Sequence, residues 1–143
     1  MSRAPDRELL LAFLSDAVSV LHEACGVAAT VDDRAVPTGS EIAVIIHAHG
    51  DLSGVTWTFP CELARRVAQH MVPGIDPDPE LCEAAASELA NVLTGRGLAV
   101  LAAHGVTVEI EPPRVIAAAA PGIAGRLATA LGAIGVVFHG GVR

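Results

Sequence analysis

The 143-residue sequence contains no lysine and no tyrosine, and aromatic residues make up only 3% of it. Its nine basic residues are all arginines and are outnumbered by 16 acidic residues, which gives a formal net charge of -7. Nucleic acids and anionic membranes select clustered basic side chains, whereas these arginines are scattered and form a single doublet, Arg65-Arg66. The composition therefore argues against partners of either kind.

Cysteines and long apolar runs are also scarce. Cys25, Cys61 and Cys82 form no CxxC spacing, and their odd number argues against a disulfide framework, so we expect buried, reduced thiols. The apolar stretch from Leu9 to Leu14 is too short to span a bilayer and is soon followed by Asp16. Because no signal peptide is evident, the sequence favours a soluble cytoplasmic protein.

Aliphatic residues are abundant instead. The hydrophobic fraction is 52%, enough to form a core without disulfides or metals, and the length fits one domain. No linker or internal repeat divides the chain, so we predict a single domain over residues 1–143. Trp57 and three phenylalanines are the few large side chains available to its core.

Residue patterns divide the chain into helices and strands. Apolar residues three and four apart predict helices, and runs of branched residues between turn residues predict strands. The helices are expected at about residues 6–23, 61–71 and 78–103, and the strands at about 27–31, 42–49, 55–59, 106–111, 115–118, 126–131 and 136–139. Glycine-rich connections are expected at 50–54 and 132–135. This order predicts an α+β domain with long helices laid on a mostly antiparallel sheet.

The longest predicted helix begins with Asp78 as its capping residue and Pro79 at its first position, and Gly105 ends it. One face combines small side chains with one acid and one amide: Ala84, Glu88, Asn91 and Gly95, with Ser87 and Thr94 beside them. The opposite stripe should face the core and comprises Leu81, Ala85, Leu89, Val92 and Leu93. Because most side chains on this outer face are small, another protein's backbone can approach it closely. A glutamate and an asparagine at this spacing also occur on ordinary solvated helices.

The surrounding sequence makes the pattern more specific. Residues 88–95, ELANVLTG, resemble the E-x-x-N-x-x-x-G signature of the CheC/CheX/FliY phosphatases. Residues 110–115, IEPPRV, resemble a Pro-Pro-x-Val step typical of CheX. Residues 50–55, followed by Phe59-Pro60, resemble the CheX hairpin that leads into its second helix. The resemblance extends over roughly residues 9–138, with one E-x-x-N motif, as in CheX, rather than the two of CheC.

This resemblance implies a CheX-like phosphatase that hydrolyses the aspartyl phosphate of a CheY-like receiver domain. It assigns Asn91 to orienting the attacking water, because a carboxamide oxygen accepts one water hydrogen and aims the lone pair at phosphorus. It assigns Glu88 to pairing with the active-site lysine of the receiver. The Mg²⁺ that balances the phosphate charge belongs to the receiver, so the chain is expected to need no metal or cofactor of its own. Contacts with the partner are expected from Ala84, Ser87, Gly95 and Arg96.

Two positions depart from the family pattern. The family often has Asp or Ser four residues before the glutamate, where this chain has Ala84, and Asn after the glycine, where it has Arg96. Arg96 lies off the centre of the face and is expected at the rim of the receiver. The missing polar group at Ala84 keeps open a second function, a catalytically weak binding or dimerisation module in two-component signalling. A small-molecule sensor with a pocket between helix and sheet is a third, supported only by the general shape of such domains.

The resemblance also implies a homodimer. The C-terminal strands carry little charge and are apolar, which suits edge-to-edge pairing between copies. The hairpin with Val136, Val137 and Phe138 is the candidate joint. The alternative is that these strands are internal to one sheet.

Three other patterns have ordinary explanations. His47 and His49 share a strand face near Asp51 and could hold Zn²⁺, but a half-exposed strand face is the simpler interpretation. Residues 50–54 lack the lysine and the following helix of a phosphate-binding loop, which favours a hairpin turn. His104 is expected as a favourable cation near a helix C-terminus.

Overall fold

The computed structural model describes residues 6–37 and 39–140. These residues form three helices and seven strands: α1 (Arg7–Cys25), β1 (Ala29–Val31), β2 (Glu41–Gly50), β3 (Leu52–Pro60), α2 (Cys61–Met71), α3 (Pro79–Ala103), β4 (Val108–Ile110), β5 (Arg114–Ile116), β6 (Ile123–Thr129) and β7 (Gly132–Gly140). The predicted α+β class is confirmed. The prediction of a single domain over residues 1–143 stays a prediction, and residues 1–5, 38 and 141–143 lie outside the described residues.

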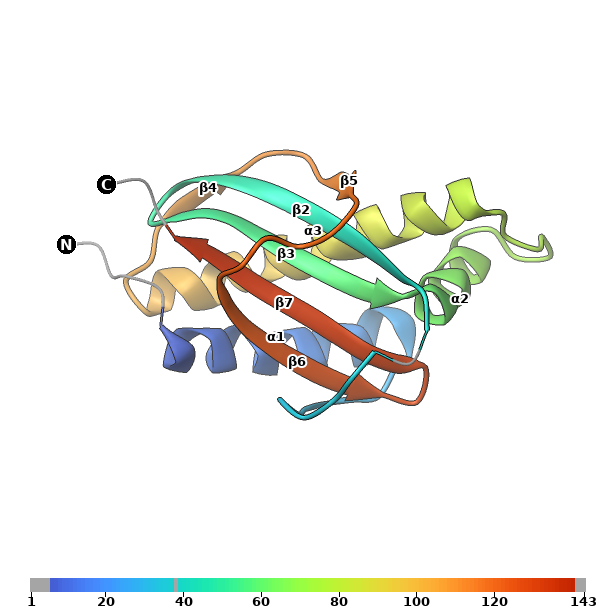
Figure 1. The fold of residues 1–143 in the computed structure, drawn as a ribbon, viewed down its shortest axis with the longest axis horizontal. Coiled ribbons are helices and arrows are strands. Elements are labelled where there is room, and N and C mark those ends of the chain that lie inside the picture. The colour runs from blue at the N-terminus through green and yellow to red at the C-terminus, as the bar shows by residue number, and fades with distance from the viewer. Residues whose placement is uncertain (1–5, 38, 141–143) are drawn as a thin grey trace.

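The strands form one antiparallel sheet. Its order is β1-β6-β7-β3-β2-β4, and β5 also pairs with β2. Helix α1 packs against β6 and β1, and α3 packs against β2 and β3, so these two helices cover one face of the sheet, with α2 at its end (Figure 1). The segment after β5 crosses the other face before it enters β6 (Figure 1).

Local capping residues set where the two long helices begin. The Asp6 carboxylate accepts a hydrogen bond from the backbone N–H of Leu9 at 2.8 Å, and the Asp78 carboxylate does the same for Leu81 at 2.8 Å. Gly26 ends α1 with φ 64°, a conformation that a side chain disfavours. These signals are local, which explains why the predicted starts agree with the structure.

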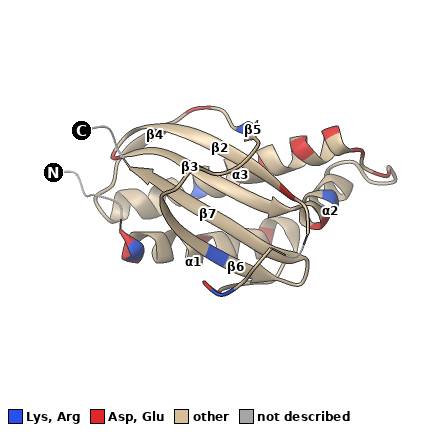
Figure 2. Cartoon of the chain, viewed as in Figure 1, with Lys and Arg blue, Asp and Glu red and all other residues tan. Residues whose placement is uncertain are grey.

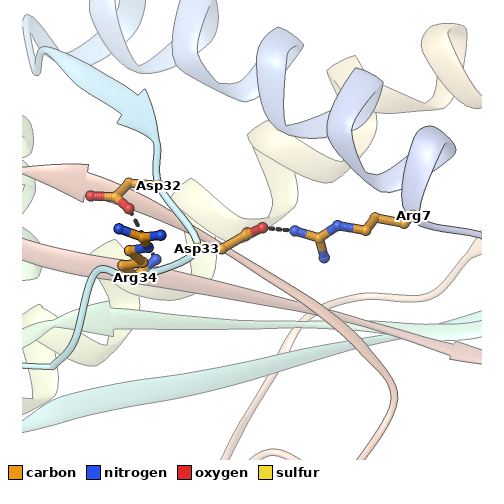
Figure 3. Close-up of polar contacts among 4 residues, drawn as sticks. All are labelled: Arg7, Asp32, Asp33 and Arg34. Atoms are coloured by element: carbon orange, nitrogen blue, oxygen red, sulfur yellow. Dashed lines mark hydrogen bonds and ion pairs between the residues drawn. The ribbon is translucent and has the colours of Figure 1, made fainter.

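An ion pair ties the loop after β1 to the start of α1. Arg7, in the first turn of α1, pairs with Asp33 (Figure 3). Next to it, the Asp32 carboxylate accepts a hydrogen bond from the backbone N–H of Arg34 at 2.9 Å, which closes a tight turn (Figure 3). The loop is therefore held against the N-terminal end of α1.

The core between sheet and helices is mainly aliphatic, with one aromatic cluster. The Phe13 ring lies 5.7 Å from Trp57 and 5.1 Å from Phe138, in an edge-on arrangement with the latter. Phe59 stacks on Trp57 at 5.8 Å. All four side chains are buried, so α1, β3 and β7 meet at this cluster.

The predicted five-residue connection at 50–54 is wrong. Strand β2 continues to Gly50 and β3 starts at Leu52, so Asp51 alone separates them. Leu52 is fully buried, and Asp51 is fixed by Thr107: its N–H donates to the Thr107 carbonyl at 3.1 Å, and its carboxylate accepts from the Thr107 N–H at 2.9 Å. Because Thr107 is distant in sequence, turn residues alone do not indicate this arrangement.

The C-terminal hairpin also differs from the prediction. Its turn is Ala130-Leu131 rather than 132–135, and Thr129 pairs with Gly132. Strand β7 pairs with β6 on one side and with β3 on the other, and both Val136 and Phe138 are buried. Strand β7 is therefore an interior strand and cannot be an edge-to-edge joint between two copies. The homodimer itself stays a prediction.

Candidate functional site

The outer face of α3 is arranged as its spacing predicts. Ala84, Glu88, Asn91 and Gly95 are all exposed, and Ser87 is partly buried beside them. The opposite side packs into the core through Ala85, Leu89 and Leu93, which are buried, and through Leu81 and Val92, which are partly buried. An acid and an amide thus project from the same side of one helix, with small side chains at the neighbouring positions of that face.

Thr94 does not belong to this exposed face. It is fully buried, and its hydroxyl accepts a hydrogen bond from the indole N–H of Trp57 at 2.9 Å. Helical spacing did not reveal this contact because Thr94 lies at the border between the exposed and the buried side. The presence of one tryptophan could have indicated the contact, because a buried indole N–H needs a hydrogen-bond acceptor nearby.

Two glycines two residues apart on α3 have different surroundings. A Cβ built at Gly95 would meet nothing within 4 Å, so this position is open to solvent or to a partner. A Cβ at Gly97 would overlap the Phe13 ring. Gly95 therefore keeps the outer face bare, whereas Gly97 lets α1 and α3 approach each other.

Arg96 points toward α1 rather than along the centre of the face. Its guanidinium lies 3.6 Å from the Glu23 carboxylate, and its side chain is 59% exposed. Burial raises the pKa of the nearby Asp16 carboxyl, and the positive charge of Arg96 partly offsets that rise. Helical spacing on α3 could not indicate these partners, because Glu23 and Asp16 lie on α1. The predicted contact of Arg96 with a receiver stays a prediction.

Charge is distributed unevenly along α3. Acidic residues cluster at its N-terminal end and on the segment before it, where Figure 2 shows red positions: Asp76, Asp78, Glu80 and Glu83. Arg65 of α2 pairs with Asp76. The C-terminal part, from Gly97 to Ala103, carries no charged side chain. The N-terminal end of α3 is thus acidic, whereas its C-terminal part beyond Arg96 is uncharged.

Of the histidines noted in the sequence, His49 and His104 contact other groups, and so does His139, which the sequence did not single out. His49 Nε2 lies 2.6 Å from a Glu111 carboxylate oxygen, and His139 Nε2 lies 2.7 Å from the Thr56 hydroxyl. His104 caps the end of α3, with its Nδ1 2.9 Å from the Val100 carbonyl oxygen. Within residues 6–37 and 39–140, no three His, Cys, Asp or Glu side chains gather as they would around a metal ion.

The three cysteines are free, as expected, but they are only partly buried, which corrects the expectation of buried thiols. Burial raises the pKa of the Cys25 thiol. Burial also raises that of Cys61, and the nearby Cys82 adds to the rise. A raised pKa lowers the thiolate fraction at neutral pH, so neither Cys25 nor Cys61 is set up as a nucleophile.

Across the described part of the chain, no helix combines the length and the apolar character that crossing a membrane requires.

The fold of this chain matches that of solved chemotaxis proteins. The sequence matches no protein-family model and no curated protein. The chemotaxis protein CheX from Desulfovibrio desulfuricans superposes with a TM-score of 0.74 at 20% identity, covering 92% of this chain and 97% of that one. A chain of the CheX–CheY–BeF3–Mg²⁺ complex from Borrelia burgdorferi gives a TM-score of 0.63 at 20% identity, covering 92% and 97%.

A more distant match is the middle domain of FliM from H. pylori. Its TM-score is 0.56 at 9% identity, and the match covers 94% of each chain. All three superpositions extend over nearly the full length of both chains, so the similarity concerns the whole fold rather than one motif. The chain therefore has the fold of the CheX and CheC-like chemotaxis proteins, as the resemblance of its sequence predicts.

Proposed function

We propose that this protein is a phosphatase that hydrolyses the aspartyl phosphate of a CheY-like receiver domain. The observation that carries the proposal is the joint exposure of Glu88 and Asn91 on the bare outer face of α3. The fold supports it, because it is also the fold of a CheX solved together with CheY, BeF3 and Mg²⁺.

Asn91 supplies the chemistry in this proposal. A water molecule attacks phosphorus, the bond between phosphorus and the aspartyl oxygen breaks, and the products are a free aspartate and inorganic phosphate. The Asn91 carboxamide accepts one hydrogen of that water and holds it in line with the breaking bond. No nucleophile or strongly perturbed base is needed, because an acyl phosphate is already reactive toward a correctly placed water.

Glu88 supplies docking. It lies three residues before Asn91 on the same exposed side, so a receiver that reaches one also reaches the other. A carboxylate here pairs with the lysine of the receiver's phosphorylation site, and the acidic residues around the start of α3 favour a partner surface with basic character. The Mg²⁺ that neutralises the phosphate is supplied by the receiver. Gly95 leaves room for the partner's backbone.

The proposal is tested by mixing the protein with phosphorylated receiver domains from the same cell and measuring both binding and the rate of phosphate loss. Faster phosphate loss with at least one receiver supports the phosphatase. Binding without acceleration supports instead a binding module on the same fold. The exposed methyl group of Ala84 favours that second function, since it offers no polar contact one turn before Glu88.

Replacing Glu88 with glutamine is expected to weaken receiver binding more than turnover. The change removes the charge that pairs with the receiver lysine and keeps the shape, so KM should rise by about 5- to 10-fold, as for loss of a charge pair worth roughly 1 kcal/mol. Steady-state kinetics with a phosphorylated receiver measure the split between kcat and KM. Glu83→Gln, which changes an exposed acid five residues earlier on α3, is the matched control. Equal effects at Glu83 and Glu88 would show general electrostatic attraction instead of a specific pair.

A further inference from the structure

A buried hydrogen bond connects α3 to the centre of the sheet. The Thr94 hydroxyl and the Trp57 indole are both 0% exposed, and they are joined at 2.9 Å. Breaking a buried bond of this kind leaves an unsatisfied donor at a cost of about 1–3 kcal/mol, which keeps the pair together. Thr94 is three residues after Asn91, so the bond holds α3 within one helical turn of the proposed catalytic amide.

Strand pairing and ring contacts hold Trp57 in place. It lies on β3 between two neighbouring strands, opposite Val44 of β2 and Val136 of β7. Its ring contacts Phe13 at 5.7 Å and stacks on Phe59 at 5.8 Å. The indole N–H therefore occupies a fixed point in the core, and the helix must bring an acceptor to it.

Rotation of α3 about its own axis is the movement that this contact controls. Apolar packing alone is tolerant of small rotations because it has no preferred direction. A rotation of about 10° moves a side-chain atom that is roughly 5 Å from the helix axis by about 1 Å. A displacement of that size is enough to lower a reaction rate about a hundredfold when the displaced group positions a reactant. The Thr94 bond and the tight contact at Gly97 restrict such rotation on two successive turns of α3.

We propose that Thr94 is a positioning residue for Asn91: its hydrogen bond to Trp57 fixes the rotation of α3 and so aims the Asn91 amide at the phosphoryl group. This inference rests on the proposed function. It assigns a role in turnover to a residue that no receiver can touch, because Thr94 is completely buried.

The test compares Thr94→Val, which removes the acceptor at nearly constant shape, with Thr94→Ser, which keeps it. Thr94→Val is expected to lower kcat by about tenfold while KM for the phosphorylated receiver stays within about twofold, because the docking face remains exposed. Thr94→Ser should keep most of the wild-type kcat. Trp57→Phe removes the other partner, and combining it with Thr94→Val should reduce kcat no further than the more impaired single variant, because both remove one bond.

Tryptophan fluorescence supplies an independent readout. Trp57 is the only tryptophan and the chain has no tyrosine, so fluorescence excited at the long-wavelength edge of tryptophan absorption comes from this residue alone. The emission maximum should shift in Thr94→Val and stay near the wild-type position in Thr94→Ser. Circular dichroism at the assay temperature checks that each variant is folded.

The outcomes separate the two proposals. A wild-type protein that accelerates phosphate loss, together with a Thr94→Val variant of unchanged kcat, would overturn the positioning role and leave the phosphatase standing. A Thr94→Ser variant as slow as Thr94→Val would also overturn it, since the acceptor is present in one and absent in the other. A wild-type protein that accelerates phosphate loss from no receiver would overturn the phosphatase and, with it, the positioning role.

Discussion

Replacing Asn91 with alanine is expected to abolish the acceleration of receiver dephosphorylation and to leave the protein folded. Asn91 is exposed on α3, so its removal opens no cavity, and the free energy of unfolding should change by no more than about 0.5 kcal/mol. Loss of the group proposed to orient the water should lower the rate to the receiver's own value, a decrease of up to about a hundredfold. The measurement is phosphate release from a phosphorylated receiver with saturating protein.

The chain offers a matched control for this variant. Asn91 is its only asparagine and Gln69 its only glutamine, and Gln69 is likewise exposed on a helix, α2. Gln69→Ala therefore removes an exposed carboxamide away from the proposed site and should retain full activity. Binding of Asn91→Ala to a receiver loaded with beryllium fluoride, a non-hydrolysable substitute for the phosphoryl group, should remain close to wild type. Wild-type turnover by Asn91→Ala would remove Asn91 from the mechanism.

Replacing Gly97 with alanine is expected to have the largest effect on stability. The new Cβ would lie 2.7 Å from Cδ1 of Phe13 and closer still to Cε1. Phe13 cannot move aside without disturbing its contacts with Trp57 and Phe138. Overpacking of this kind costs about 1–3 kcal/mol, which exceeds the gain of up to about 1 kcal/mol from the better helix propensity of alanine. Urea denaturation measures the change in the unfolding free energy.

Gly95 supplies the comparison, because it occupies the same helix two residues earlier with open space around it. Gly95→Ala should raise the unfolding free energy by up to about 1 kcal/mol. The two variants make the same chemical change, and opposite signs are expected only if α3 turns Gly97 toward α1 and Gly95 outward. Destabilisation of equal size at both positions would contradict this orientation of the helix.

The elements that the sequence predicts well are those with local signals. Asp6 and Asp78 cap α1 and α3 through bonds to residues three positions on, so the sequence marks both starts. The connection at Asp51 and the turn at Ala130-Leu131 were missed for a different reason. Their geometry is set by pairing with Thr107 and by the register of β6 and β7, and such contacts leave no local pattern.

In the candidate site, too, the sequence predicts the features that depend on local spacing and misses those that depend on distant contacts. Helical spacing places Glu88 and Asn91 together, and the structure places both on the exposed side of α3. Spacing could not show that Thr94 turns inward to Trp57 or that Arg96 lies near Glu23, because those partners come from β3 and α1. The edge role expected of β7 was wrong because strand order in a sheet depends on long-range pairing, which places β7 between β6 and β3.

Catalysis by the α3 face is tested most directly by the rate constant of phosphate loss from a Mg²⁺-bound, phosphorylated receiver, measured as the concentration of this protein is raised. We predict a rate constant that rises and then saturates with wild-type protein, and that stays at the receiver's own value with Asn91→Ala. A rate constant that does not change with wild-type protein, under conditions where a complex with the receiver is observed, would contradict the phosphatase.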